Sequence, residues 1–310
     1  MKVFVTGVGG QLGHDVMNEL IRRGHAAVGS DIAPVYSGIA DGSAVTAAPY
    51  VPLDITDAAA VEAVLTAERP DAVVHCAAWT AVDLAEDDDK AEKVSAINAG
   101  GTAHIAQACK ALDAKMVYIS TDYVFNGLGT EPWDPDCKDY RPLNVYGKSK
   151  LEGELAVSST LDKYFIVRIA WVFGLNGKNF IKTMLKLAET HDTLRVVCDQ
   201  IGTPTYTFDL ARLLVDMVES DKYGYYHATN EGGYISWYDF TCEIFRQAGV
   251  SNVKVLPVTT AEYGLSKAAR PFNSRLDKSK LRKSGFEPLP DWKDALHRFL
   301  VEYRALESHV

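Results

Sequence analysis

The chain has 310 residues, of which 47% are hydrophobic and 24% are charged, as in ordinary folded domains, and this excludes wholesale disorder. Its formal net charge of −9 argues against binding to nucleic acid or anionic lipid through positive charge. No apolar run approaches the ~18 residues that a membrane-spanning helix needs, and the N-terminal segment does not fit a signal peptide. We therefore expect a cytoplasmic protein without a nucleic-acid or membrane partner.

Cysteine and histidine spacing gives no sign of a disulfide framework or a metal site. The chain has five cysteines, an odd number, and none forms a CxxC pair. Its histidines form neither HxxxH nor HExxH. The acidic run at residues 86–89 lacks the ligand spacing of a calcium loop, so we interpret it as the solvated start of a helix. No metal is predicted.

Short β-rich apolar runs alternate with helical patterns through the first half of the chain. Strands are predicted at residues 2–6, 26–31, 72–76, 115–120 and 164–171. Helices are predicted at residues 11–23 and 97–112 and from about residue 145. This alternation is typical of βαβ units, so it predicts an α/β fold with a Rossmann-like, doubly wound parallel sheet.

After about residue 173 this alternation ends, and amphipathic helices are predicted at residues 236–248 and 291–306. We expect a Rossmann domain over residues 1–172 and a smaller, mainly helical lobe over residues 173–310, with a segment near 199–230 returning to the first domain. In open α/β sheets the ligand crevice lies beyond the carboxyl ends of the strands. Such a lobe would close one side of that crevice.

A glycine-rich motif, TGVGGQLG at residues 6–13, stands between the first predicted strand and the first predicted helix. Gly7 would permit the tight turn, Gly10 would let the backbone approach a pyrophosphate, and Gly13 would let helix and strand pack closely. The helix N-terminus would supply N–H donors to the phosphates. A glycine cluster can also be a bare turn, so its context decides.

Acidic residues follow the next two strands in the positions that a dinucleotide site requires. Asp31 ends the second predicted strand, where a carboxylate can accept hydrogen bonds from the adenosine ribose. Asp54 and Ile55 end a further strand candidate and could flank the adenine. Asp31 alone could be an ordinary strand-end residue, but together with the glycine motif it predicts a dinucleotide cofactor.

Tyr146 and Lys150 are four residues apart, which places both on one face of a predicted helix. A phenol with an ordinary pKa of ~10 is a poor acid–base group at neutral pH. A lysine ammonium held beside it would favour the phenolate and lower that pKa. Taken alone, the pair could equally be a surface aromatic beside a solvated lysine.

The segment STDYVF at residues 120–125 directly follows an apolar strand, at the end where a parallel sheet presents side chains to its crevice. Thr121 could hydrogen-bond a substrate carbonyl oxygen and hold it against the Tyr146 hydroxyl. Reduction of a carbonyl needs a hydride donor at the carbon and a proton donor at the oxygen. The glycine motif, Thr121 and the Tyr146–Lys150 pair therefore predict carbonyl reduction.

These three motifs resemble the extended short-chain dehydrogenase/reductase superfamily and, within it, the dTDP-4-dehydrorhamnose reductase family. The resemblance continues in residues 75–83, 168–174, 199–205 and 270–277, so it spans nearly the whole chain. Trp79 stands where the family often has tyrosine, and Asn126 where aspartate is common. Both departures would adjust shape rather than chemistry.

The resemblance implies a role for each matching residue. Catalysis would fall to Thr121, Tyr146 and Lys150. The cofactor would be lined by Gly7, Gly10, Gln11, Leu12, Gly13, Asp31, Asp54, Ile55, Ala77, Ala78, Thr80, Tyr146 and Lys150. The nucleotide-sugar would be contacted by Val82, Thr121, Asp122, Phe125, Trp171 and Arg270. Arg270 is either a diphosphate clamp or a surface charge, and Trp171 is either a substrate wall or a packed aromatic.

The implied activity is reduction of the C4 ketone of dTDP-6-deoxy-L-lyxo-4-hexulose to dTDP-L-rhamnose by NADPH or NADH. Asp31 favours NADH, because its charge would repel a 2′-phosphate, whereas the family is often described with NADPH. Some members carry a magnesium site of glutamates at a dimer interface; no matching cluster is found here, so a homodimer stays open. Two alternatives also stay open: a nucleotide-sugar epimerase or dehydratase, and a non-catalytic regulatory subunit similar to methionine adenosyltransferase β.

Overall fold

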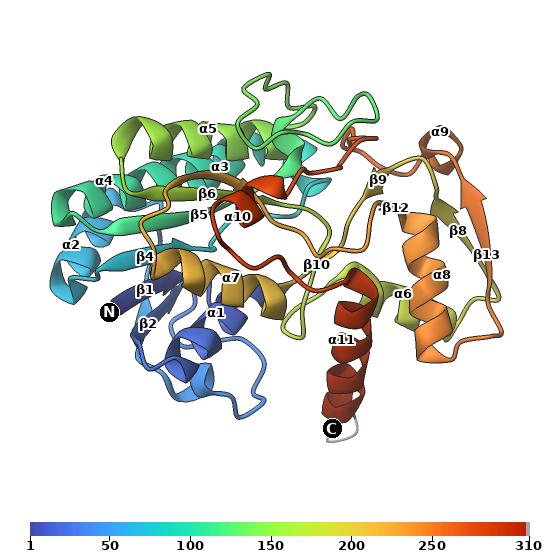
Figure 1. Cartoon of the computed structure of the whole chain (residues 1–310), viewed down its shortest axis with the longest axis horizontal. Coiled ribbons are helices and arrows are strands. Elements are labelled where there is room, and N and C mark those ends of the chain that lie inside the picture. Colours follow the sequence, from blue (N-terminus) through green and yellow to red (C-terminus); the bar gives the residue numbers. More distant parts are fainter. Residues whose placement is uncertain (308–310) are drawn as a thin grey trace.

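The computed structural model describes residues 1–307 and is organised around a seven-stranded, all-parallel sheet (Figure 1). In spatial order the strands are β11 (Gly224–His227), β6 (Tyr164–Ile169), β5 (Lys115–Thr121), β4 (Ala72–His75), β1 (Lys2–Thr6), β2 (Ala26–Asp31) and β3 (Tyr50–Pro52). The strand order reverses between β1 and β4, which is the switch point of a doubly wound sheet. The predicted Rossmann-like fold is confirmed.

Helices cover both faces of the sheet because its strands are apolar on both sides. Val3 and Val5 of β1 point to one face and Phe4 to the other, and all three are completely buried. The first face is covered by α1 (Gln11–Arg22) and α7 (Thr207–Val218). The second is covered by α2 (Ala58–Glu68), α4 (Thr102–Leu112) and α5 (Val145–Thr160).

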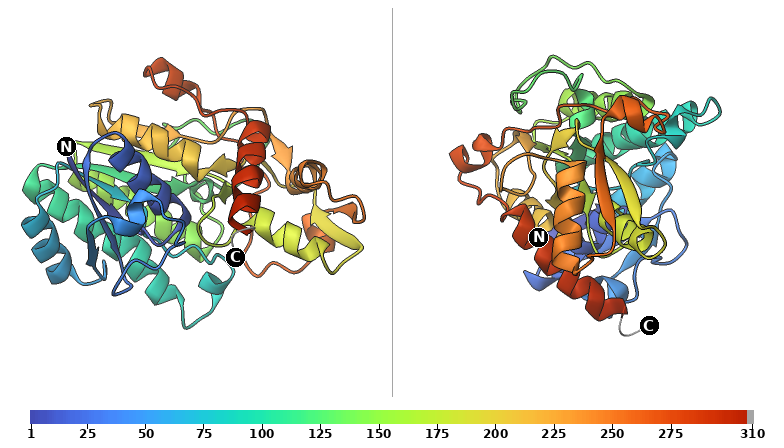
Figure 2. Two further views of the ribbon diagram at one scale, coloured as in Figure 1. Left: turned by 90° about the horizontal axis from the view of Figure 1, so that it is seen from below. Right: turned by 90° about the vertical axis from the view of Figure 1, so that its right-hand side faces the viewer.

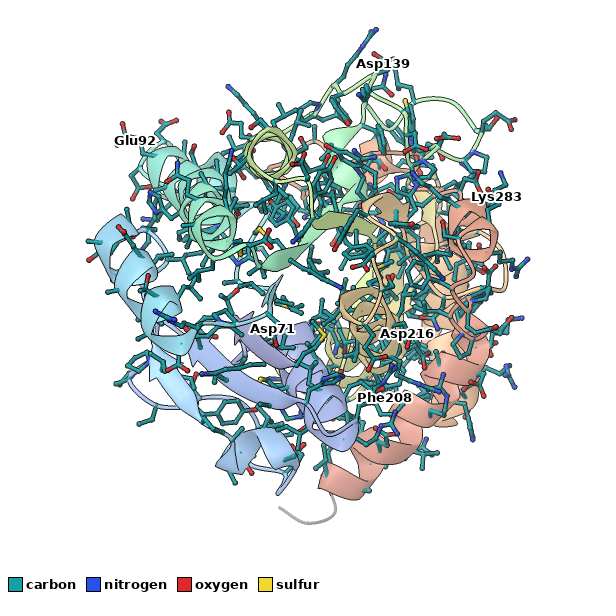
Figure 3. All side chains as sticks on the ribbon, turned by 60° about the vertical axis from the view of Figure 1, so that its left-hand side comes forward. Asp71, Glu92, Asp139, Phe208, Asp216 and Lys283 are labelled. Carbon is teal, nitrogen blue, oxygen red and sulfur yellow. The ribbon has the colours of Figure 1, made fainter. Side chains whose placement is uncertain are left out.

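The α1–α7 layer joins distant parts of the chain. Arg23, which ends α1, donates hydrogen bonds to Asp216 and Glu219 near the end of α7. Asp216 is labelled in Figure 3, where side chains fill the space between the sheet and its helices. Residues 207–227 thus return to the sheet, α7 as a covering helix and β11 as the edge strand.

A second hydrophobic cluster lies beside the carboxyl ends of the strands, at the opposite end of the long axis from the N-terminus (Figures 1 and 2). Its helices are α6 (Phe180–Ala188), α8 (Trp237–Ala248), α9 (Thr260–Tyr263) and α11 (Trp292–Glu307). Its strands are the parallel pair β8 (Thr193–Val197) and β13 (Lys254–Val258). The sequence had not indicated these two strands. We call this part the lobe; its status as a separate domain stays a prediction.

The remaining elements are short. Helical turns are η1 (Ala44–Ala47), η2 (Leu84–Glu86), α3 (Ala91–Ser95), η3 (Ala96–Gly101), η4 (Asp122–Val124) and α10 (Ser279–Lys283). Short strands pair as β7 (Val172–Phe173) with β10 (Thr205–Tyr206), and as β9 (Ile201–Gly202) with β12 (Ile235–Ser236). No helix within residues 1–307 is long and apolar enough to cross a membrane.

Three sequence expectations need correction. The helix expected at residues 97–112 begins with a π-helical turn, η3, before α4. The strand expected to reach Trp171 ends at Ile169, because Trp171 adopts a left-handed backbone with φ of 52°. The acidic run at 86–89 does not start a helix: Glu86 accepts a hydrogen bond from the Val145 amide at 2.7 Å and so serves the start of α5.

Candidate active site

A cavity of about 1080 Å³ opens at the carboxyl ends of the parallel strands, where the sheet meets the lobe. Residues that end or follow β1, β2, β3, β4, β5 and β6 line it, and Phe180 of α6 and Trp237 of α8 line it from the lobe. This is the crevice in which doubly wound sheets bind their ligands. It gathers the three motifs that the sequence analysis singled out.

The glycine motif forms a cradle that no larger residue could occupy. Gly7 has φ of 72°, and a Cβ there would lie 2.6 Å from the Ala77 amide nitrogen. A Cβ on Gly13 would lie 2.3 Å from the Gly7 carbonyl oxygen. Gly10 precedes α1 without a capping side chain, so the N–H groups of the first turn are open to an anion. The cradle therefore fits a dinucleotide pyrophosphate.

Asp31 lies at the end of β2, on the wall next to this cradle. Its carboxylate accepts hydrogen bonds from the Gly9 amide at 2.9 Å and the Ile32 amide at 2.8 Å. These bonds hold the carboxylate in place beside the cavity. All predicted cofactor residues line the cavity: Gly7, Gly10, Gln11, Leu12, Gly13, Asp31, Asp54, Ile55, Ala77, Ala78, Thr80, Tyr146 and Lys150. Their contacts with a cofactor stay a prediction.

Helix α5 presents Tyr146 and Lys150 to the cavity from its first turns. Asn144 caps the helix by accepting a hydrogen bond from the Gly147 amide at 2.7 Å. A Cβ on Gly147 would lie 2.3 Å from the Tyr123 carbonyl oxygen, so glycine lets the helix start pack directly on η4. Packing of this kind brings Tyr146 next to Thr121, which ends β5.

The protein around Tyr146 shifts the pKa of its phenol. Burial raises its pKa above the ordinary range, the nearby Asp122 carboxyl raises it further, and a hydrogen bond with Thr121 opposes both. Without a cofactor, burial therefore sets the direction of the shift in the Tyr146 pKa. The lowering expected from Lys150 together with an oxidised nicotinamide stays a prediction. A protonated phenol is the form that can donate a proton, so this direction suits carbonyl reduction.

Lys150 is almost completely buried, with 3% of its surface exposed. Burial lowers its pKa to about 7, and the carboxylate of Glu154 opposes that effect. The ammonium nitrogen lies 4.2 Å from the centroid of the Tyr118 ring, a cation–π contact from β5 below the helix. The apolar setting thus holds the pKa of Lys150 well below its ordinary value of 10.5.

On the sugar side, Val82, Thr121, Asp122 and Trp171 line the cavity. Asp122 is buried, and burial raises its pKa to about 6, although hydrogen bonds from Ser274 and Thr121 oppose this effect. Trp171 stacks on Trp237 with ring centroids 3.7 Å apart. Trp171 is therefore a packed aromatic that also lines the cavity, and its contact with a substrate stays a prediction.

Two predicted sugar contacts do not line the cavity. Phe125 is completely buried and stacks on Trp133 at 4.5 Å, so its side chain belongs to a small core instead. Arg270 is hydrogen-bonded to Asp83 at 2.5 Å and to the Tyr123 hydroxyl at 3.2 Å. The Phe125 position does not support substrate contact, and Arg270 is engaged by neighbours rather than open as a clamp.

The sequence analysis missed several residues of the site. Phe180 and Trp237 give the cavity an aromatic wall, and Lys93 and Lys178 place cations on it. Asn98, in η3, accepts a hydrogen bond from the Trp79 amide at 2.8 Å and donates one to Ser149 on α5 at 2.9 Å. Asn98 does not line the cavity but ties the wall at Trp79 to α5, and the π-helical turn that carries it has no simple sequence signal.

The described part of the chain contains no ready set of ligands for a metal ion. Within residues 1–307, no group of three or more His, Cys, Asp and Glu side chains is arranged to hold an ion. The cysteines, all of which fall in this range, are free.

Comparison with known proteins agrees with the fold and identifies the family. The family model of the RmlD substrate binding domain matches residues 1–305. A dTDP-4-dehydrorhamnose reductase of Streptomyces griseus is 41% identical over 298 residues, which cover 94% of this chain and 90% of that protein.

Solved structures give the same result. The dTDP-4-dehydrorhamnose reductase of Clostridium acetobutylicum is 38% identical, has a TM-score of 0.88 and covers 98% of this chain and 100% of its own. That of Bacillus anthracis, solved in complex with NADP, is also 38% identical, with a TM-score of 0.86 and coverage of 97% and 99%.

The parallel sheet, the glycine cradle and the Tyr146–Lys150 pair define an NAD(P)H-dependent oxidoreductase of the short-chain dehydrogenase/reductase type. Within this class, the chain belongs to the RmlD substrate binding domain family.

Proposed function

We propose that the protein reduces the C4 ketone of dTDP-4-dehydro-6-deoxy-L-mannose, also called dTDP-6-deoxy-L-lyxo-4-hexulose, to dTDP-L-rhamnose with NADPH or NADH. One observation carries the proposal: Tyr146, Lys150 and Thr121 meet in the same cavity as the glycine cradle. The relatives named above supply the substrate, because their names give this keto-sugar.

Each residue has a defined task in this reaction. When bound, a reduced nicotinamide would supply the hydride that the C4 carbon of the sugar needs. Tyr146 donates its hydroxyl proton to the C4 oxygen, so that a ketone becomes an alcohol and the phenol becomes a phenolate. Lys150 would stabilise that phenolate and hold the nicotinamide ribose, while Thr121 would hold the C4 oxygen in line. Solvent then returns the proton to Tyr146.

The walls of the cavity divide between the two ligands. The cradle of Gly7, Gly10 and Gly13 would hold the pyrophosphate of the cofactor, and Asp31 would bind the adenosine ribose. Val82, Asp122 and Trp171 would contact the sugar nucleotide. We accordingly assign cofactor binding to residues 1–172 with the returning segment near 199–230, and sugar binding mainly to the rest of residues 173–310.

The proposal includes a cytoplasmic location, which the free cysteines support, because a reducing compartment keeps thiols unpaired. A homodimer is a separate part of the proposal. Size-exclusion chromatography with light scattering would distinguish one chain from two.

The test is an assay of absorbance at 340 nm. Purified protein is mixed with the dTDP-4-keto-6-deoxy sugar, generated with its epimerase, and with NADPH or NADH in separate runs. We expect stoichiometric loss of reduced cofactor and formation of dTDP-L-rhamnose, identified by mass spectrometry and NMR. Conversion of the keto-sugar to a product other than dTDP-L-rhamnose, without net consumption of cofactor, would indicate an epimerase or dehydratase. No turnover of any keto-sugar would indicate a non-catalytic subunit.

A further inference from the structure

A buried ion pair lies one helical turn beyond Lys150 and has no part in the mechanism above. Glu154 of α5 and Arg168 of β6 both have side chains with no exposed surface. The guanidinium binds the carboxylate through two hydrogen bonds, from Nε to Oε1 at 2.8 Å and from Nη2 to Oε2 at 2.7 Å. This bidentate geometry is the strongest arrangement available to the two groups.

Arg168 is itself fixed on every side. It donates hydrogen bonds to the Pro135 carbonyl oxygen at 3.1 Å and to the Tyr140 hydroxyl at 3.1 Å. The Phe125 and Tyr225 rings contact the guanidinium with centroids at 5.0 and 4.9 Å. Glu154 therefore has a single orientation, and its negative charge stays on the α5 face that also carries Lys150.

The surroundings of Lys150 contain few charges. The titratable side chains that face it are His75 and Cys76 from the end of β4, Tyr118 from β5, and Tyr146 and Glu154 from α5. Burial lowers the pKa of His75 to about 3 and raises that of Cys76 to about 12, so both are neutral near pH 7. Burial also raises the pKa of each tyrosine, so both phenols are neutral as well.

Within residues 1–307, Glu154 is thus the one charged group among those facing Lys150. We infer that Glu154, fixed by Arg168, is a positioning residue that acts through Lys150: its charge keeps the lysine an ammonium inside an apolar wall. The ammonium is what stabilises the Tyr146 phenolate once the proton has gone to the sugar. This inference rests on the proposed function only for its effect on turnover, since the effect on Lys150 itself is independent of any substrate.

The direction of the effect follows from electrostatics. Burial disfavours the charged form of Lys150, and the carboxylate of Glu154 favours it. Removing that carboxylate lowers the pKa of Lys150, so the ammonium is lost at a lower pH. For an opposite charge one helical turn away, a shift of about one pH unit is expected. The alkaline limb of the kcat profile should move down by the same amount.

The variants must separate this effect from simple destabilisation. Glu154→Gln alone leaves Arg168 as an unpaired buried charge, which can unfold a protein. The double variant Glu154→Gln with Arg168→Met removes both charges, and Glu154→Asp keeps the negative charge. Because the Arg168 cation disfavours the Lys150 ammonium, its removal offsets part of the effect, so the double variant should shift Lys150 less than Glu154→Gln does. Asp209→Asn is the matched control, because Asp209 is buried and accepts two hydrogen bonds from Arg298, at 2.9 and 2.7 Å, without facing Lys150.

Lys150 can be followed directly by NMR of protein labelled with ¹³C at the lysine ε-carbon, with its signal assigned from Lys150→Arg. In the protein without ligands, we expect the Lys150 midpoint to fall by about one pH unit in Glu154→Gln, to fall by a smaller amount in the double variant, and to stay in place in Glu154→Asp and Asp209→Asn. An unchanged midpoint in a folded double variant overturns the inference and leaves the ion pair a structural one.

The kcat profile is then measured with NADPH and the keto-sugar. A parallel shift of its alkaline limb in the double variant supports the inference. A shifted limb in Asp209→Asn would overturn it. A shifted NMR midpoint in a protein that turns over no keto-sugar would uphold the inference for Lys150 while rejecting the proposed function.

Discussion

On the cofactor side of the cavity the wall is mostly backbone, whereas on the sugar side it is made of large side chains from segments far apart in the chain. Gly7 and Gly13 let main-chain atoms approach to distances that a Cβ would block. Opposite them, Trp171 and Trp237 stack face to face from different elements. A backbone wall suits a ligand common to many enzymes, and a side-chain wall can be changed by substitution to suit one sugar.

The largest effect should come from the group at the boundary of the two sides. Tyr146→Phe removes the proton donor but keeps the ring, so we expect kcat to fall roughly 10²–10⁴-fold. NADPH affinity, followed by fluorescence, should stay within about 3-fold, because the phenol is not part of the cradle. Tyr50→Phe, which removes a hydroxyl bonded to the Ala33 carbonyl oxygen, serves as a control. Near-full activity of Tyr146→Phe would reject its assigned role.

A substitution of Phe125 tests whether its side chain serves packing or contacts the sugar. Since its buried ring stacks on Trp133 and contacts Arg168, Phe125→Ala should lower the free energy of unfolding by about 3–5 kcal/mol. Urea titration measures this loss. At a temperature where the variant is folded, KM for the sugar should be nearly unchanged. A raised KM for the sugar with an unchanged free energy of unfolding would show that Phe125 contacts the sugar.

The backbone wall is tested at Gly13. A Cβ there meets the Gly7 carbonyl oxygen, so Gly13→Ala must displace the cradle. Overpacking of this kind typically costs 1–3 kcal/mol, which corresponds to NADPH binding weaker by roughly 10- to 100-fold. Gly100→Ala is the matched control, since its nearest neighbour would lie 4.0 Å away. Equal NADPH affinity in the two variants would contradict a tightly fitted cradle.

The smallest effect concerns the choice between NADH and NADPH. Asp31 places a carboxylate on the cavity wall beside the cradle, where it would accept bonds from a ribose and repel a 2′-phosphate. Asp31→Ser should therefore raise the ratio of kcat/KM for NADPH over NADH about 10-fold. Asp54→Ser provides the comparison, because Asp54 binds Thr56 on another part of the wall. An unchanged ratio would show that Asp31 does not determine the choice between NADH and NADPH.

The difference between the backbone wall on the cofactor side and the side-chain wall on the sugar side also explains what could be predicted from the sequence. The cradle, Asp31, Thr121 and the Tyr146–Lys150 pair each depend on residues near one another in the chain, so their spacing is informative. Phe180 and Trp237 reach the cavity only through the folding of the lobe. Their roles follow from tertiary packing, which spacing does not record.

The degree to which individual side chains are buried could also not be predicted from the sequence. The expected lowering of the Tyr146 pKa considered the charges of Lys150 and of an oxidised nicotinamide, but not the loss of water around the phenol, which is the largest effect in the protein alone. Phe125 stands in a motif that resembles a family sugar site. The order of apolar and polar residues around it does not show that its side chain points into a small core. The strand β6 stops early because Trp171 takes a left-handed backbone, which residue type alone would disfavour.

The central claim is that Tyr146 and Thr121 together hold the C4 oxygen of the sugar. A crystal structure of the protein with NADP⁺ and dTDP-L-rhamnose tests it most directly. We expect the C4 hydroxyl oxygen to lie ~3 Å from both the Tyr146 hydroxyl and Thr121 Oγ1. A well-ordered sugar nucleotide whose C4 oxygen lies out of hydrogen-bond reach of Tyr146 would contradict the account.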